Sequence, residues 1–198
     1  MKRFEELREW IRSGACNLAT SPDTALFFSR NCPDYPELWY RGQVAKLSPL
    51  GVIEIKKTPG GSELATRIRT ALANNEISPR EETRLWGEAS KRFARVAEGK
   101  VIAFVENAHI NDTFMRKELP TLLKNPRVTH INGIPRQELE QEVQEKLDNG
   151  VHKSAALEEC RSRISEKMAE MARQRQEENA RLRAFEQEQL RKPISLQR

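Results

Sequence analysis

Residues 78–105 read SPREETRLWGEASKRFARVAEGKVIAFV, and this stretch predicts a helix followed by a strand. Ser78 and Glu81 form a helix start, because the Ser78 hydroxyl can accept from the third amide while the Glu81 carboxylate reaches back to the first. Apolar residues then recur at helical spacing as far as Ala97. The wholly apolar run 101–105 is typical of a strand covered on both faces. A buried strand fed by an amphipathic helix indicates a layered α/β fold.

Further elements are expected on both sides of this pair. Apolar spacing and turn residues predict helices over 4–13, after Ser21-Pro22-Asp23 and over 62–73. Loop and short helix are expected over 31–49. Strands are expected over 52–55 and 128–131. The fold class is therefore α/β (α+β), with a helical N-terminal half packed on a small, mainly parallel sheet layer.

The composition changes after Pro135, where glycine and β-branched residues almost disappear and Glu, Gln, Arg and Lys dominate. We expect a domain over 1–134 and a long charged helical arm over 135–198, broken near Asn149-Gly150. Charged residues interrupt the apolar spacing of the arm, which argues against a sustained coiled coil. A solvated helix packed at one end and an arm that oligomerises or binds a protein partner both remain open.

The charge is concentrated in the first part of the chain. The net charge is +5, and because thirteen Lys and Arg balance thirteen Asp and Glu over 136–198, all of it belongs to residues 1–135. Nucleic acid, a membrane surface or a phosphorylated small molecule would satisfy it equally well. No stretch approaches the roughly 20 apolar residues that span a bilayer, so we expect a cytoplasmic protein without membrane attachment.

Common cofactor and metal motifs are missing from the sequence. Three cysteines and three histidines show no metal-ligand spacing, and neither a P-loop nor a dinucleotide-binding glycine turn occurs. We expect buried thiols, no metal and no bound cofactor.

Three short stretches carry a specific pattern: LFFSR at 26–30, LWGEASKRFA at 85–94 and NDTFMRKE at 111–118. Together they resemble the nicotinamide-ribosyl site of the ADP-ribosyl cyclase / NAD glycohydrolase family, over roughly residues 20 to 133. The resemblance implies NAD⁺ or NADP⁺ as substrate. The animal members are stapled by disulfides, which this chain cannot form, so the likeness is to reduced bacterial toxins and antiviral defence effectors.

The chemistry of NAD cleavage explains which residue types matter. Breaking the nicotinamide–ribose bond leaves positive charge on the sugar, so the enzyme needs a carboxylate beside the ribose, aromatic walls for nicotinamide and donors for the diphosphate. By resemblance, Glu118 is the catalytic carboxylate, Trp86 is one nicotinamide wall and Ser90 positions the ribose. Phe28 stands where the family has the other tryptophan.

The resemblance also implies the groups that hold the rest of the substrate. Ser29, Arg30, Thr113 and Phe114 would contact or flank the diphosphate, and Thr58 matches a family threonine. Two positions earlier the family has an acidic residue that influences whether the intermediate is hydrolysed or cyclised; a lysine stands there in this sequence.

The expected function is therefore an NAD(P)⁺ glycohydrolase that yields nicotinamide and ADP-ribose and is restrained by a protein partner or by assembly. Cyclisation or ADP-ribosyl transfer would use the same cation, so the sequence does not separate them. A basic nucleic-acid-binding or adaptor protein without catalysis is the alternative from another class. Its patch would comprise Lys56, Lys57, Arg67, Arg69, Arg92 and Arg95.

Overall fold

The computed structural model describes residues 2–29, 51–106 and 108–191, and these form a mixed α/β fold around a mostly parallel sheet. In the described part the strand order is β2-β1-β3-β4-β5, with the first four strands parallel and β5 antiparallel to β4. The strands are β1 (Ala25–Phe28), β2 (Ile53–Glu54), β3 (Gly99–Phe104), β4 (Val128–Ile131) and β5 (Ile134–Pro135). The predicted mainly parallel sheet is confirmed.

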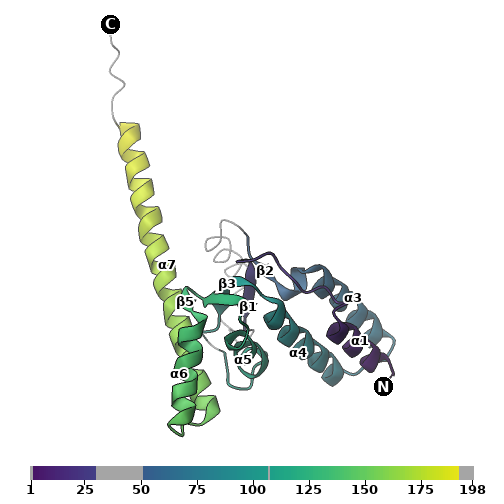
Figure 1. Ribbon diagram of the computed structural model, residues 1–198. Coiled ribbons are helices and arrows are strands. Elements are labelled where there is room, and N and C mark those ends of the chain that lie inside the picture. The colour runs from purple at the N-terminus through teal and green to yellow at the C-terminus, as the bar shows by residue number, and fades with distance from the viewer. Residues whose placement is uncertain (1, 30–50, 107, 192–198) are drawn as a thin grey trace.

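Helices flank this sheet in two groups (Figure 1). At the right of the view lie α1 (Lys2–Ser13), α3 (Pro59–Ala73) and α4 (Pro79–Val96). At the left lie α6 (Arg136–Asp148) and α7 (Lys153–Arg191), with the short α5 (Leu119–Leu123) below the sheet. No helix in the described ranges is both long and apolar enough to span a bilayer.

The predicted start of α4 is confirmed, and both ends of this helix are fixed by side chains. Ser78 Oγ accepts from the Glu81 amide at 3.2 Å, and Glu81 Oε2 accepts from the Ser78 amide at 2.8 Å. At the other end, Asn125 Nδ2 donates to the carbonyls of Ala94 and Ala97, each at 2.9 Å. These bonds satisfy helix-end groups that would otherwise lack partners, and they hold the element that carries much of the candidate site.

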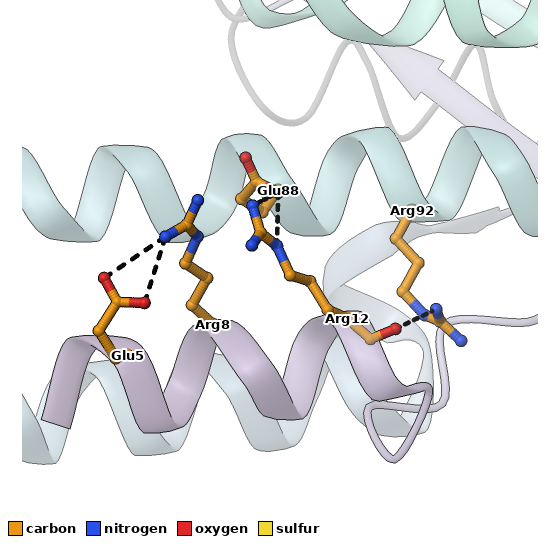
Figure 2. Close-up of polar contacts among 5 residues, drawn as sticks. All are labelled: Glu5, Arg8, Arg12, Glu88 and Arg92. Carbon is orange, nitrogen blue, oxygen red and sulfur yellow. Dashed lines mark hydrogen bonds and ion pairs between the residues drawn. The ribbon is translucent and has the colours of Figure 1, made fainter. Parts of the chain in front are cut away.

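Polar contacts also join α4 to α1 (Figure 2). Arg12 Nη2 lies 3.3 Å from Glu88 Oε2, and Arg92 Nη1 donates to the Arg12 carbonyl at 3.1 Å. On α1 itself, Arg8 pairs with Glu5. The carboxylate of Glu88 is thus already engaged by a cation from α1.

The described residues share one hydrophobic core, which includes part of the charged C-terminal segment. Leu139 of α6 and Leu157, Cys160 and Ile164 of α7 are buried with the sheet residues. Residues on both sides of the expected boundary after 134 therefore share this core, and the division into two domains stays a prediction. The later part of α7 projects away from the core (Figure 1), and its Phe185 is 59% exposed.

Asn132 connects these parts through its side chain. Its amide donates to the carbonyls of Ala103 at 2.8 Å and Ile164 at 3.0 Å, and its Oδ1 accepts from the Ala103 amide at 2.8 Å. The residue has a φ of +50°, a conformation that asparagine tolerates better than most residues. One buried side chain thus joins β3 and α7.

The helix predicted after residue 21 is wrong. Residues 22–23 form a turn and the chain then enters β1, because the apolar residues 25–28 pair with both β2 and β3. Asp23 adopts a φ of +65°, and its carboxylate accepts from the Lys100 amide. Sheet pairing therefore overrides the local helix signal here.

The next strand and helix differ from the prediction in their bounds. β2 covers only Ile53–Glu54 and a 3-10 turn, η1 (Ile55–Lys57), follows it. α3 begins at Pro59 and includes Gly60 and Gly61 rather than starting after them. A Cβ added at Gly61 would lie 1.8 Å from the Ile55 carbonyl oxygen, so this glycine permits close packing inside the helix.

The two cysteines in the described ranges, Cys16 and Cys160, are free and buried, as predicted. Burial raises the pKa of the Cys16 thiol to about 11 and that of Cys160 to about 12. Such thiols are poor nucleophiles at neutral pH. Cys32 and the loop and short helix predicted over 31–49 lie outside the described residues.

Candidate active site

A cavity of about 450 Å³ opens at the carboxyl end of β1, beside the segment that follows β3. β1 connects onward to β2 on one side, whereas β3 connects onward to β4 on the other. Such a reversal of direction between neighbouring parallel strands leaves a crevice at their carboxyl ends, where α/β proteins commonly bind ligands. The topology alone therefore marks this cavity as a candidate site.

The three stretches singled out in the sequence meet in this cavity. Seven of the nine residues predicted for the site line it: Phe28, Ser29, Trp86, Ser90, Thr113, Phe114 and Glu118. They come from the end of β1, one face of α4, and the turn η2 (Phe114–Glu118) with the residue before it. Of the other two, Arg30 lies outside the described residues.

Thr58 is the second predicted residue that does not line the cavity. Its side chain is buried, its hydroxyl donates to the Ile55 carbonyl at 2.7 Å, and its oxygen accepts from the Gly61 amide at 3.0 Å. Thr58 therefore caps α3 and fixes the preceding turn, two of whose residues, Ile55 and Lys56, do line the cavity. Its placement gives it a supporting role.

Glu118 has the most unusual environment among the carboxyl groups that line the cavity. Its side chain is buried, with 7% of the residue surface exposed. Burial raises the pKa of Glu118 from its usual 4.5 to about 7, and a hydrogen bond with the Ser90 side chain opposes part of this rise. A carboxyl group that is poised near neutral pH and aimed into a cavity is typical of functional sites.

The local backbone helps to place this group. η2 is one turn of π-helix, a wide turn that is rare and is frequently found at functional sites. Phe114 and Met115 at its start are buried and anchor it in the core, while Glu118 at its end faces the cavity. α4 contacts η2, so Ser90 reaches Glu118 across this interface.

Aromatic and cationic groups form the other walls. Trp86 is half-buried on α4, and the Lys56 ammonium lies 5.2 Å from the centroid of its ring, a cation–π distance. Phe27 and Phe93 also line the cavity and pack against each other, with ring centroids 4.9 Å apart. The half-buried Phe28 ends β1 and lines the cavity as well. The cavity thus offers flat apolar surface next to a cation.

Sequence reasoning gave the side chain of Asp112 no role of its own, but the structure places this residue in the cavity lining. Its Oδ2 accepts from the Ser29 hydroxyl at 2.7 Å and from the His109 amide at 2.8 Å. These bonds join the end of β1 to the segment after β3, across 83 residues of sequence. Glu82, Thr83 and Lys56 also line the cavity without having been predicted as site residues.

Comparisons with protein-family models, curated proteins and solved structures found no match to this chain. Within the described ranges, no three His, Cys, Asp or Glu side chains are grouped so that they could bind a metal ion. The chemistry of this site is therefore argued from its own residues.

Proposed function

We propose that the protein is an NAD(P)⁺ glycohydrolase that cleaves the bond between nicotinamide and ribose, and that it acts as a toxin or defence effector by depleting NAD. The observation that carries the proposal is the buried Glu118, hydrogen-bonded to Ser90 in a cavity that Trp86 and Phe28 also line. This set of groups matches what the reaction requires, because charge develops on the sugar while a flat aromatic ring departs.

In the proposed reaction, the bond from ribose C1′ to the pyridinium nitrogen breaks and its electron pair moves to that nitrogen. Nicotinamide leaves as a neutral molecule and positive charge remains on the ribose. The Glu118 carboxylate stabilises this charge and accepts a hydrogen bond from a ribose hydroxyl, and its interaction strengthens as the charge develops. Water then adds to C1′ and releases a proton, which yields ADP-ribose.

The other lining residues take the parts of the substrate that suit them. Trp86 and Phe28 provide flat surfaces for nicotinamide, and Ser90 orients Glu118 and the reacting ribose. Lys56 at the cavity and the exposed Thr113 suit the negatively charged diphosphate. The buried position of Glu118 strengthens its attraction for the cation, because a medium of low polarity screens charge weakly.

Incubation of the purified protein with NAD⁺ and, separately, with NADP⁺ tests the proposal, with products resolved by chromatography. We expect nicotinamide and ADP-ribose or its phosphorylated form. Glu118→Gln should lower turnover at least about a hundredfold, the scale for losing a group that stabilises transition-state charge. Glu98→Gln is the matched control, since Glu98 is exposed and precedes β3 at the opposite end of the sheet.

A cyclic product would reassign the same site to cyclisation, and a labelled protein side chain would reassign it to ADP-ribosyl transfer. Full activity of Glu118→Gln would refute the role of this residue. If neither dinucleotide is cleaved by the wild-type protein, and neither binds in a calorimetric titration, the proposed function is wrong.

A further inference from the structure

A second and larger cavity, of about 750 Å³, lies beside the C-terminal half of α4. Its lining has seven cationic side chains and a single carboxylate, that of Glu88. The cations are Lys91, Arg95, Arg116, Lys117, Lys124, Arg127 and Lys153, and we call this region the basic cavity. Lys91 lies about 140° around α4 from Trp86, and Arg95 lies about 140° from Ser90, so the two cavities use different faces of that helix.

The positive charge of the basic cavity is not balanced within the described part of the chain. Glu88, its one carboxylate, is already paired with Arg12 of α1 at 3.3 Å (Figure 2). None of the seven cations forms an ion pair with a described carboxylate. Desolvation lowers the pKa of Lys117, Glu88 opposes this, and the nearby Lys91 and Arg116 lower it further. The cations therefore repel one another, and a bound anion would relieve this repulsion.

Some of these cations have a structural reason to be where they are. Arg127 Nη2 donates to the Arg95 carbonyl at 2.7 Å, near the C-terminal end of α4. Lys124 follows the last residue of α5. Cations are favourable at helix C-termini, where carbonyl groups concentrate negative charge. Arg95 lies in the last turn of α4, so the same holds for its charge. Fold stability alone could therefore account for these three.

The remaining cations have no such explanation. The side chains of Lys91, Arg116 and Lys153 form no hydrogen bond or ion pair with any described residue. Lys153 is also the first residue of α7, where the helix dipole disfavours positive charge. Lys117 lies across Gly87, whose added Cβ would come 2.4 Å from its Nζ, so the absence of a side chain there leaves room for the lysine. Anion binding therefore explains the positions of these cations better than fold stability does.

The shape and lining of the basic cavity indicate the kind of anion. The cavity is concave and within the size range of small-molecule sites, about 300–1,000 Å³. Its lining contains no aromatic side chain on which bases could stack. Seven cations exceed what one phosphate group needs, because each phosphate is usually held by a few donors. We propose that the basic cavity binds a small ligand carrying several phosphate groups, which it recognises through those phosphates.

The test uses the full chain and inorganic tripolyphosphate as the probe, titrated by calorimetry at several salt concentrations. We expect binding at low salt that weakens steeply as salt rises. The triple variant Lys91→Ala, Arg116→Ala, Lys153→Ala should bind at least about tenfold more weakly and with a smaller salt dependence. The control, Arg69→Ala, Arg80→Ala, Arg183→Ala, removes three exposed cations elsewhere, so the net charge of the two variants is the same.

Equal affinity of both triple variants would show that binding follows net charge only, and it would overturn the proposal. No binding by the wild-type protein at low salt would overturn it as well. A single-stranded oligonucleotide is titrated in parallel. If it binds far more tightly than tripolyphosphate and loses this affinity in the Lys91, Arg116, Lys153 variant, the cavity is a nucleic-acid surface instead. Because the readout is binding of a probe without nicotinamide, failure of NAD cleavage would leave this result standing.

Discussion

Glu118 combines two properties that oppose each other: its proposed role requires a charged carboxylate, while its burial favours the neutral acid. The pKa of about 7 is the net result, with the Ser90 hydrogen bond as the opposing contribution. We therefore predict that kcat/KM for NAD⁺ rises with pH and levels off above about 7, as the acid ionises in the free enzyme. Initial rates from pH 5 to 9 measure this. An activity that falls with pH across the same range would contradict the need for the charged form.

The same shift predicts how stability depends on pH. The folded-state pKa of Glu118 is raised above 4.5, so its favourable contribution is present below pH 4.5 and is lost as pH rises towards 7. At pH 8 the burial of charge should reduce the free energy of unfolding by up to about 3 kcal/mol. Glu118→Gln should therefore have a higher free energy of unfolding than the wild type at pH 8. This advantage should be much smaller at pH 5.

Urea unfolding of both proteins at pH 5 and pH 8 measures this difference. If the two proteins differ in unfolding free energy by the same amount at pH 5 and pH 8, Glu118 does not change its charge over this range. The expected result would also explain why a buried acid is retained at the expense of stability, as is common where function needs a strained environment.

Asn132 allows a test of a buried hydrogen-bond network in which the substitution adds no backbone strain. Asn132→Gly keeps a residue that tolerates φ of +50° but leaves Ala103 and Ile164 without their side-chain partners. We predict a loss of about 2–4 kcal/mol in the free energy of unfolding. Asn75→Gly is the control, because Asn75 has a similar φ of +54° and is exposed. Equal effects of the two changes would show that the network contributes little.

At the scale of one element, the start of α4 gives a prediction of its own. Ser78→Ala removes the acceptor of the Glu81 amide, so we expect a loss of about 1 kcal/mol in unfolding free energy. Activity should change little, because the cavity residues of α4 lie at least one turn further on. Ser62→Ala, an exposed serine inside α3, should have no comparable effect in the same urea titration. A stability unchanged by Ser78→Ala would show that packing alone sets this helix end.

The elements that sequence patterns predicted well are those whose local signals agree with their tertiary contacts. Helix α4 has a capping box and an amphipathic stripe, strand β3 contains an apolar run, and β4 has β-branched residues bounded by turns. The segment at Ser21 and Pro22 shows a similar capping signal but leads into residues that complete the sheet. Local sequence cannot report that a neighbouring strand will be present, so this helix was predicted in error.

In the candidate site, too, residues with a local sequence signal were predicted and a contact between distant segments was not. Trp86 and Ser90, four residues apart, were expected on one face of a helix and do line the same cavity. The contact between Ser29 and Asp112 joins segments far apart in sequence and had no local signal. The cations named for the nucleic-acid-binding alternative do not line one cavity. Lys56 lines the candidate site and Arg95 lines the basic cavity, while Arg67 pairs with Glu63 and Arg92 donates to a carbonyl of α1.

At the scale of the whole molecule, the later part of α7 can be separated from the core. The last core residue of this helix is Met168, and beyond it the described side chains are mostly exposed. We predict that deleting residues 174–198 leaves the unfolding free energy and NAD cleavage essentially unchanged. Urea titration and product chromatography measure both. Loss of cleavage with the fold intact would instead show that this segment takes part in the site.

Light scattering of the same truncated protein tests the two alternatives for the arm. A lower oligomeric mass than that of the full chain would assign the segment to self-assembly, in which the exposed Leu182 and Phe185 could be buried. An unchanged mass would leave two alternatives for the segment: it binds a different protein, or it is a solvated helix without a partner.

The bonds from Asn132 to α7 have a consequence for when the proposed activity can appear during synthesis of the chain. The carbonyl of Ile164 and the buried Leu157 and Cys160 belong to the core that also holds β3, and the segment after that strand carries Thr113, Phe114 and Glu118 of the site. A growing chain on the ribosome that ends before residue 164 has every proposed site residue but lacks the helix that completes the core behind them. Cleavage of NAD by nascent chains should therefore begin only late in translation, after α7 has emerged and packed.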